Sequence, residues 1–156
     1  KSKAWLFNDL DNVSDPEIKS IVISKLDTCF TNSLPVSFEC RQPLREIQGI
    51  NKFDLIRLLG IAFDNAIEAS ENFTAPEIKV LLLNTDVGFE FEIRNKVAST
   101  FDITKLQQAG VTTKEGHAGL GLASAQAIIS NYNNVFLARA IKDNWFTFTL
   151  YVNKEG

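Results

Sequence analysis

Apolar residues recur at helical spacing in two stretches of the chain, residues 15–31 and 51–70. Ser14 and Pro16 are typical of a helix start, and we expect Ser14 to be the N-cap of the first helix. An alanine-rich stretch, residues 120–131, predicts a third helix. The second helix is expected to pack on a sheet, because one of its faces carries Leu55, Leu58, Leu59, Ala62 and Ala66.

Shorter segments alternate between apolar and polar residues, as β-strands do. They span residues 36–40, 77–84, 89–95, 135–141 and 145–152. Residues 85–88 and 142–144 separate two pairs of these segments at the spacing of hairpin turns. Helices and strands are mixed without the strict alternation of a parallel sheet. The pattern therefore predicts an α/β two-layer sandwich, with a mixed sheet and helices on one face.

The interval from Lys96 to Gly119 follows neither pattern. It is polar, contains Gly110 and Gly116, and offers one short helical segment at residues 102–107. Connections of this length inside a compact domain are usually functional loops or disordered segments. We expect a flexible lid here.

Composition narrows the class of protein. A chain of 156 residues with 45% hydrophobic content suits one domain with one core. The net charge of −3 and the lack of a basic run argue against nucleic acid as the main partner. No apolar stretch reaches the roughly 18 residues of a membrane span, and no signal peptide is indicated. Cys29 and Cys40 lack a CxxC pattern, which favours buried free thiols in a reducing compartment.

A polar cluster interrupts the second predicted helix. Asp64, Asn65 and Glu68 share one side of the helix by their spacing. The side-chain oxygen of Asn65 is a candidate ligand for a magnesium ion, which keeps several waters and otherwise binds nucleotide phosphates. Taken alone, the cluster is more typical of a solvated helix edge.

Glycines before the third predicted helix favour a nucleotide site over a solvated helix edge. The segment Gly116-His-Ala-Gly-Leu-Gly-Leu leads into the helix, where backbone amides can approach phosphate oxygens near the positive end of the helix dipole. The segment lacks the Lys-Ser/Thr ending of a P-loop, and alone it is also consistent with a hinge. Lys114, with Thr112 and Thr113, lies just upstream, where its ammonium group could reach terminal phosphates.

These elements, in this order, resemble the GHKL ATP-binding superfamily of gyrase, heat-shock ATPases, mismatch-repair proteins and histidine kinases. Leu58-Leu-Gly-Ile-Ala-Phe-Asp-Asn-Ala-Ile-Glu-Ala-Ser looks like the N-box of that family, and Gly119-Leu-Gly-Leu looks like its second glycine box. Asp-Asn-Ala-Ile-Glu-Ala followed by Gly-Val-Thr-Thr-Lys is most similar to the peptide-pheromone receptor kinases of Gram-positive quorum sensing. The resemblance covers about residues 36–152, and it implies the Bergerat fold.

The resemblance implies the catalytic domain of a sensor histidine kinase. Such a domain binds Mg-ATP and transfers the γ-phosphoryl group to a histidine in an upstream domain. Residues 1–33 would be a connector and the end of the upstream dimerisation helix, and residues 34–156 the ATP-binding domain. The implied partners are the upstream acceptor domain, a cognate response regulator and, in the full-length protein, a second copy. The parent would be a bacterial membrane-bound receptor with this domain in the cytoplasm.

The resemblance also implies roles for individual residues. Asn65 would be the metal ligand, and Asn65 and Lys114 the catalytic residues. The residues implied to contact the nucleotide are Asn65, Glu68, Ala69, Asn95, Thr113, Lys114, His117, Gly119, Leu120, Gly121 and Leu122. Asp64 is expected to contact the chain itself or the incoming acceptor.

Three positions depart from the family pattern. Members that hydrolyse ATP have a glutamate base one turn before the asparagine, and Ile61 stands there, which favours transfer over hydrolysis. The Asp-x-Gly-x-Gly box is replaced by Ile93-Arg-Asn-Lys-Val, as in the pheromone-receptor subgroup, so the Asn95 amide would accept from the adenine amino group. Ala118 stands where an arginine is frequent in the family, so Lys114 and His117 would neutralise more of the phosphate charge.

His117 is the single histidine of the chain, and it lies in the predicted lid instead of on a helix suited to a phosphoacceptor. It is either a lid residue near phosphate or an exposed bystander. The acceptor histidine is therefore expected in another domain. Two other functions stay open, a GHKL domain that hydrolyses ATP and a non-catalytic module that senses nucleotide or binds protein.

Overall fold

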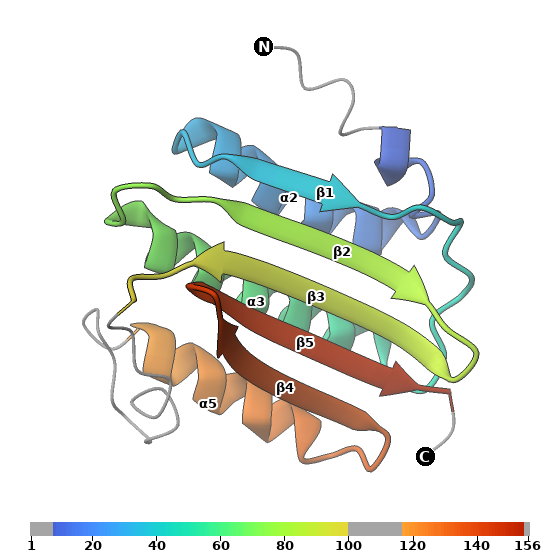
Figure 1. Ribbon diagram of the computed structural model, residues 1–156. Coiled ribbons are helices and arrows are strands. Elements are labelled where there is room, and N and C mark those ends of the chain that lie inside the picture. Colours follow the sequence, from blue (N-terminus) through green and yellow to red (C-terminus); the bar gives the residue numbers. More distant parts are fainter. Residues whose placement is uncertain (1–7, 100–116, 155–156) are drawn as a thin grey trace.

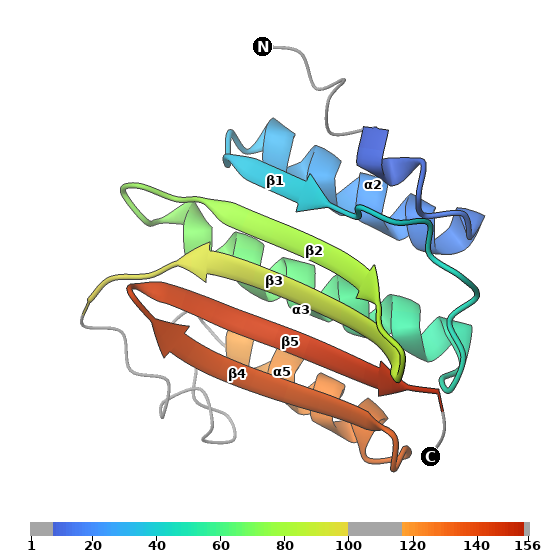
Figure 2. The ribbon, with the colours of Figure 1, turned by 45° about the vertical axis from the view of Figure 1, so that its right-hand side comes forward.

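The computed structural model describes residues 8–99 and 117–154, and for residues 117–120 it describes the backbone alone. Three helices lie side by side on one face of a five-stranded sheet (Figures 1 and 2). The helices are α2 (Pro16–Thr31), α3 (Lys52–Glu71) and α5 (His117–Ile129). The strands are β1 (Val36–Glu39), β2 (Ile78–Asn84), β3 (Gly88–Lys96), β4 (Val135–Lys142) and β5 (Trp145–Asn153).

The sheet is mixed, as the alternating patterns predict. Its strand order is β1-β2-β3-β5-β4, and β1 pairs in parallel with β2 while the other neighbours are antiparallel. Along β3, Phe89, Phe91 and Ile93 are buried against the helices, whereas Glu90 and Glu92 are partly exposed on the opposite face. The predicted two-layer α/β sandwich is therefore confirmed, and the predicted strand limits are correct to within one residue.

Helix α3 occupies the middle of the helix layer (Figure 2). It runs parallel to α2, since the Lys52 ammonium at its start bridges the carboxylates of Asp15 and Glu17, at 2.9 Å each, while Lys25 and Asp64 pair at 2.7 Å further along. Its buried face carries the five apolar residues that the sequence assigns to the core. Within residues 8–99 and 117–154, no helix is both long and apolar enough to cross a bilayer.

The first helix begins one residue later than expected. Asp15, not Ser14, is the N-cap of α2, because its carboxylate accepts hydrogen bonds from the amides of Glu17 at 2.9 Å and Ile18 at 3.1 Å. A carboxylate at this position also interacts favourably with the helix dipole. Ser14 instead donates its hydroxyl to the carbonyl of Leu44 at 3.3 Å.

Helix α2 contributes to the same core as the rest of the domain. Its buried face carries Ile18, Val22, Leu26 and Cys29, which belong to one hydrophobic cluster with residues of α3 and the sheet. Residues 1–7 lie outside the described range, and the predicted boundary at residue 33 stays a prediction.

Both cysteines are free and buried, as predicted. Burial raises the pKa of the Cys29 thiol to about 11. Burial, together with the nearby charge of Asp9, also raises the pKa of Cys40 to about 11. Each thiol is therefore protonated at neutral pH and is a poor nucleophile.

Residues 40–51 connect β1 to α3 without regular structure, yet they are held firmly. Gly49 has a positive φ of 94°, and a Cβ built there would lie 2.3 Å from the carbonyl oxygen of Asn153. The side-chain amide of Asn134 donates to the carbonyls of Gly49 at 2.7 Å and Asn153 at 2.9 Å. This connection thus has a fixed position at the end of the molecule where α2 and α3 begin.

Candidate functional site

The polar cluster of α3 and the glycine segment of α5 meet in the folded chain. A Cβ built on Gly121 would lie 3.0 Å from Oδ1 of Asn65 and 3.6 Å from Cγ2 of Ile61. Any side chain larger than a hydrogen atom at position 121 would therefore crowd the Asn65 amide. The absent side chain of Gly121 is therefore what leaves room for the Asn65 amide beside α5.

Asn65 presents an amide that the protein does not fully use. The residue is half-buried, and its Nδ2 atom is buried without a hydrogen-bond partner in the described part of the chain. Leaving a buried donor unpaired costs about 1–3 kcal/mol. A ligand or an ordered water that accepts from this nitrogen would remove that cost.

The three members of the polar cluster have different surroundings. Asp64 is exposed and binds the ammonium of Lys25 at 2.7 Å, so it joins α3 to α2 and contacts the chain itself. Glu68 is half-buried and lies one turn after Asn65. Ala69 follows at the next helical position and is exposed. Asn65 and Glu68 thus share a side of α3 by their spacing, while Asp64 is paired with Lys25 of α2.

Asn95 lies near the end of β3, on the face of the sheet that the helices cover. Its exposed fraction is only 2%, and its amide nitrogen donates a long hydrogen bond of 3.4 Å to the carbonyl of Lys96. A polar side chain buried at a strand end is a reasonable candidate for recognising a ligand. Its predicted contact with adenine stays a prediction.

Helix α5 begins earlier than the sequence pattern predicts, at His117 instead of Leu120. Gly119 and Gly121 therefore lie within its first two turns, not in a loop before it. First-turn amides lack partners inside a helix, whereas later amides bond to the carbonyl four residues back. The amides without a partner inside the helix are those of residues 117–119, while Gly121 and Leu122 use theirs within α5, and Leu122 is buried in the core.

A shallow hollow of about 460 Å³ lies beside the Gly121–Asn65 contact, between α2, α3 and α5. Its apolar lining includes Ile21, Ile56 and Ile61, and its charged lining includes Lys25, Arg57 and Asp64. Both signs of charge are present, so the described lining alone favours neither anions nor cations.

Several predicted contacts cannot be placed in the fold. Thr112, Thr113 and Lys114 lie outside the described residues, as does the predicted helical segment at 102–107, and the side chains of His117 and Leu120 are likewise not described. Across residues 8–99 and 117–154, no three His, Cys, Asp or Glu side chains are grouped so as to hold a metal.

Sequence reasoning missed a contact that fixes the other end of α5. The hydroxyl of Tyr132 donates to Oδ2 of Asp54 at 2.6 Å and accepts from the amide of Asn51 at 3.1 Å. Burial raises the pKa of Tyr132, and the hydrogen bond to Asp54 raises it further. No local pattern predicts this contact, because the partners are 78 and 81 positions away in the sequence.

Comparisons with known proteins bear on the family and the fold of the chain. The GHKL domain family matches residues 50–153. The catalytic domain of the histidine kinase ThkA is similar in structure, with a TM-score of 0.69 and 20% identity over 89% of this chain and 91% of that domain. ThkA in complex with the response regulator protein TrrA gives a TM-score of 0.70 and 16% identity, over 91% of this chain and 40% of the ThkA chain.

A third similar structure is the histidine kinase AdeS of Acinetobacter baumannii. Its TM-score is 0.62, with 17% identity over 88% of this chain and 65% of that one. At these identities the likeness to solved structures concerns the fold. No curated protein matches the sequence.

Proposed function

Since the chain belongs to the GHKL domain family, we propose that it is the ATP-binding catalytic domain of a sensor histidine kinase. The observation that supports this proposal is the proximity of Asn65 on α3 to Gly121 on α5, since these residues belong to the two motifs that the sequence assigns to a nucleotide site. In the proposed reaction, the γ-phosphoryl group of ATP passes to a histidine in an upstream domain.

Asn65 fits the role of a magnesium ligand. Its side-chain oxygen is the type of donor that magnesium prefers, and the remaining ligands would be phosphate oxygens and water. Bound there, magnesium would neutralise part of the phosphate charge. The buried Nδ2 of the same amide would donate to a phosphate or water oxygen. Glu68, one turn further along, would orient a water bound to the metal.

The start of α5 fits the role of a phosphate site. The first-turn amides of residues 117–119 lie at the positive end of the helix dipole, which attracts anions. Thr113, Lys114 and Leu120 complete the proposed phosphate contacts, while Ala69 and Asn95 are proposed to contact the nucleoside. A neutral amide accepts a hydrogen bond from an amino group less strongly than a carboxylate accepts one. With Asn95 in this position, we therefore expect modest affinity for adenine.

The residue beside Asn65 favours phosphoryl transfer over hydrolysis. Ile61 faces the same part of α5 as Asn65, and its methyl group lies 3.6 Å from the place of a Cβ on Gly121. An isoleucine cannot accept a proton from water, so this position offers no general base. A kinase does not need that base, because an imidazole of another domain is the nucleophile.

The wider biology of the parent protein is also part of the proposal. The motifs Asp-Asn-Ala-Ile-Glu-Ala and Gly-Val-Thr-Thr-Lys favour a peptide-pheromone receptor kinase. The solved complex of ThkA with TrrA supports a response regulator as partner. We further propose that residues 1–33 connect to the dimerisation domain, that the full-length receptor is a membrane-bound dimer, and that this domain lies in the cytoplasm.

A phosphotransfer assay with γ-labelled ATP tests this function. The chain is incubated with magnesium, with and without a separately supplied dimerisation domain of the parent kinase that carries its histidine. Label is expected on the added domain and not on the chain itself, because its single histidine, His117, is not the proposed acceptor.

The variant Asn65→Ala should abolish the transfer, whereas Asn72→Ala, at the exposed C-cap of the same helix, should not. Label on His117, or release of free phosphate without transfer, would contradict the proposal.

A further inference from the structure

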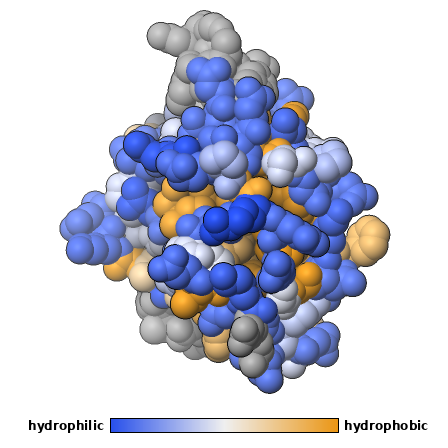
Figure 3. Space-filling model, turned by 90° about the vertical axis from the view of Figure 1, so that its right-hand side faces the viewer, coloured by the Kyte–Doolittle hydropathy of each residue, from blue (hydrophilic) through white to orange (hydrophobic). Residues whose placement is uncertain are grey.

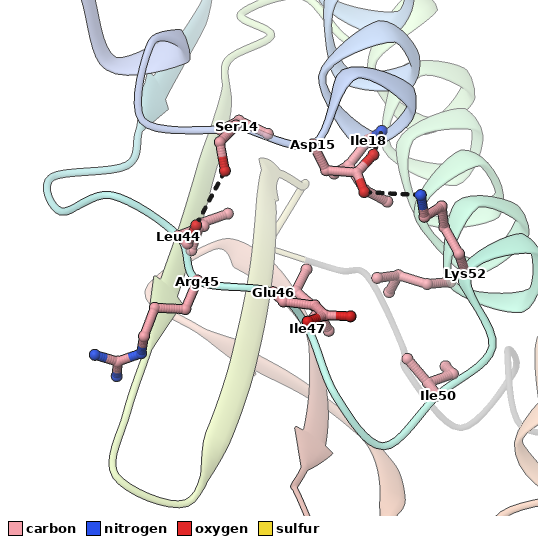
Figure 4. A pocket seen from close by; sticks show the side chains of 11 residues that line it. Ser14, Asp15, Ile18, Leu44, Arg45, Glu46, Ile47, Ile50 and Lys52 are labelled. Carbon is pink, nitrogen blue, oxygen red and sulfur yellow. Dashed lines mark hydrogen bonds and ion pairs between the residues drawn. The ribbon is translucent and has the colours of Figure 1, made fainter.

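A second hollow lies at the end of the molecule where α2 and α3 begin (Figure 4). Its volume is about 410 Å³, which is within the range of pockets for small organic ligands. Ile18, Leu44 and Leu55 contribute buried apolar lining, while Ile47 and Ile50 form a half-buried wall. Figure 3 views this end of the molecule and shows apolar surface near its centre with polar surface around it.

This hollow is separate from the proposed nucleotide site. Lys52 and Leu55 line it at the start of α3, whereas Asn65 lies toward the other end of the same helix. At a rise of 1.5 Å per residue, Lys52 and Asn65 are about 20 Å apart along the helix axis. A ligand in the hollow would therefore not touch the contact between Asn65 and Gly121.

The wall of the hollow is preformed. The amide of Leu44 donates to the carbonyl of Asn12 at 2.8 Å, and the hydroxyl of Ser14 donates to the carbonyl of Leu44 at 3.3 Å. At the far end of the wall, Asn134 holds Gly49 through a 2.7 Å hydrogen bond. Because the protein already fixes this segment, a ligand would not bear the entropic cost of ordering it.

Charged side chains of both signs line the hollow: Asp15 and Glu46 are acidic, and Arg45 and Lys52 are basic. The Lys52 ammonium is shared between the carboxylates of Asp15 and Glu17, so one positive charge faces two negative ones. Arg45 extends away from the hollow in Figure 4. Glu46 lines the hollow, and its carboxylate has no hydrogen bond or ion pair with any described residue. An apolar interior with an unpaired carboxylate at its mouth is complementary to a ligand that has an apolar body and a positively charged group.

We propose that this hollow is a binding site for a small organic cation, with a compact apolar body and a primary ammonium group. The apolar body would lie on Ile18, Ile47 and Leu55, and the ammonium group would bind the carboxylate of Glu46. The hydrophobic contact supplies affinity, and the charged hydrogen bond supplies selectivity for the cation. This inference is independent of the proposed kinase function.

Three probes with the same ring test the selectivity: cyclohexylmethylammonium, cyclohexylmethanol and cyclohexanecarboxylate. Each is titrated into the ¹⁵N-labelled chain, and amide shifts are followed by NMR. The ammonium probe should shift the amides of Leu44, Ile47 and Lys52, and should bind about tenfold more tightly than the alcohol. The carboxylate should bind most weakly.

Matched variants locate the cation. Glu46→Gln should reduce the affinity for the ammonium probe to that of the alcohol, without changing the affinity for the alcohol itself. Glu90→Gln, on the open face of the sheet, should change neither. Ile47→Trp, which fills the hollow, should abolish shifts from all three probes.

The proposal is overturned if the alcohol binds as tightly as the ammonium probe, or if Glu46→Gln leaves the affinity for the ammonium unchanged. It is likewise overturned if the shifted amides lie away from residues 44–55. Glu46 is an exposed residue, so its variant is expected to fold normally, and an unchanged amide spectrum of the unliganded chain verifies this.

Discussion

Replacing Gly121 by alanine should weaken nucleotide binding without unfolding the domain. The new Cβ would lie 3.0 Å from Oδ1 of Asn65, which is closer than Cβ contacts normally are, and 3.6 Å from Ile61, which is an ordinary contact. The Asn65 amide must therefore move by a few tenths of an ångström, while the rest of the packing between α3 and α5 can stay as it is.

The size of the effect follows from two opposing contributions. Alanine in place of glycine inside a helix stabilises it by up to about 1 kcal/mol, which offsets much of the steric strain. The net change in unfolding free energy should therefore be within about 1 kcal/mol. The displaced amide oxygen binds the metal less well, and we expect about tenfold weaker Mg-ATP binding, or ~1.4 kcal/mol.

Gly60→Ala is a matched control for this variant. It makes the same substitution in α3, but the nearest atoms to the new Cβ are 4.0 Å away, on Ile21 and Lys25. It should stabilise the domain by about 0.5–1 kcal/mol and leave nucleotide affinity unchanged. Calorimetric titration with Mg-ATP and urea denaturation measure both quantities. The reasoning is refuted if Gly121→Ala binds Mg-ATP as tightly as the wild type, or if Gly60→Ala loses as much affinity.

Two further predictions concern the ends of the helices. Tyr132→Phe removes the hydroxyl that Asp54 and Asn51 share, so urea denaturation should show a loss of about 1 kcal/mol, and no loss would contradict this contact. Burial alone would raise the pKa of Asp15, but the hydrogen bonds from Lys52 and the first-turn amides of α2 outweigh it and hold that pKa below its ordinary value. The stability from Asp15 is therefore present above about pH 4 and declines as pH falls through the folded pKa, so the stability difference between wild type and Asp15→Asn should shrink in acid. A difference that is constant from pH 7 to pH 3, by urea denaturation, would contradict this.

The regular elements were predictable because their patterns are local. Alternation identified β3 and β5 to within one residue, and the spacing of Leu55, Leu58 and Ala62 identified the buried face of α3. The start of α5 was missed because glycines usually oppose helix formation, whereas here Gly119 and Gly121 lie inside the helix and Gly121 faces Asn65.

The candidate site was predictable only in part. The motif order correctly brought Asn65 and the glycine segment together, but their spacing could not show that Gly121 serves the packing of two helices. The contact of Lys25 with Asp64 and that of Tyr132 with Asp54 join residues at least 39 positions apart. Such contacts follow from the arrangement of the helices and leave no periodic signal in the sequence.

The central claim is that the side chain of Asn65 holds a magnesium ion whose nucleotide lies at the start of α5. Calorimetric titration of ATP with and without magnesium, on the wild type, Asn65→Ala and Asn72→Ala, tests it most directly. The account predicts magnesium-dependent binding by the wild type and Asn72→Ala, and loss of that dependence in Asn65→Ala. Equal binding by all three proteins, or wild-type binding that is the same with and without magnesium, would contradict it.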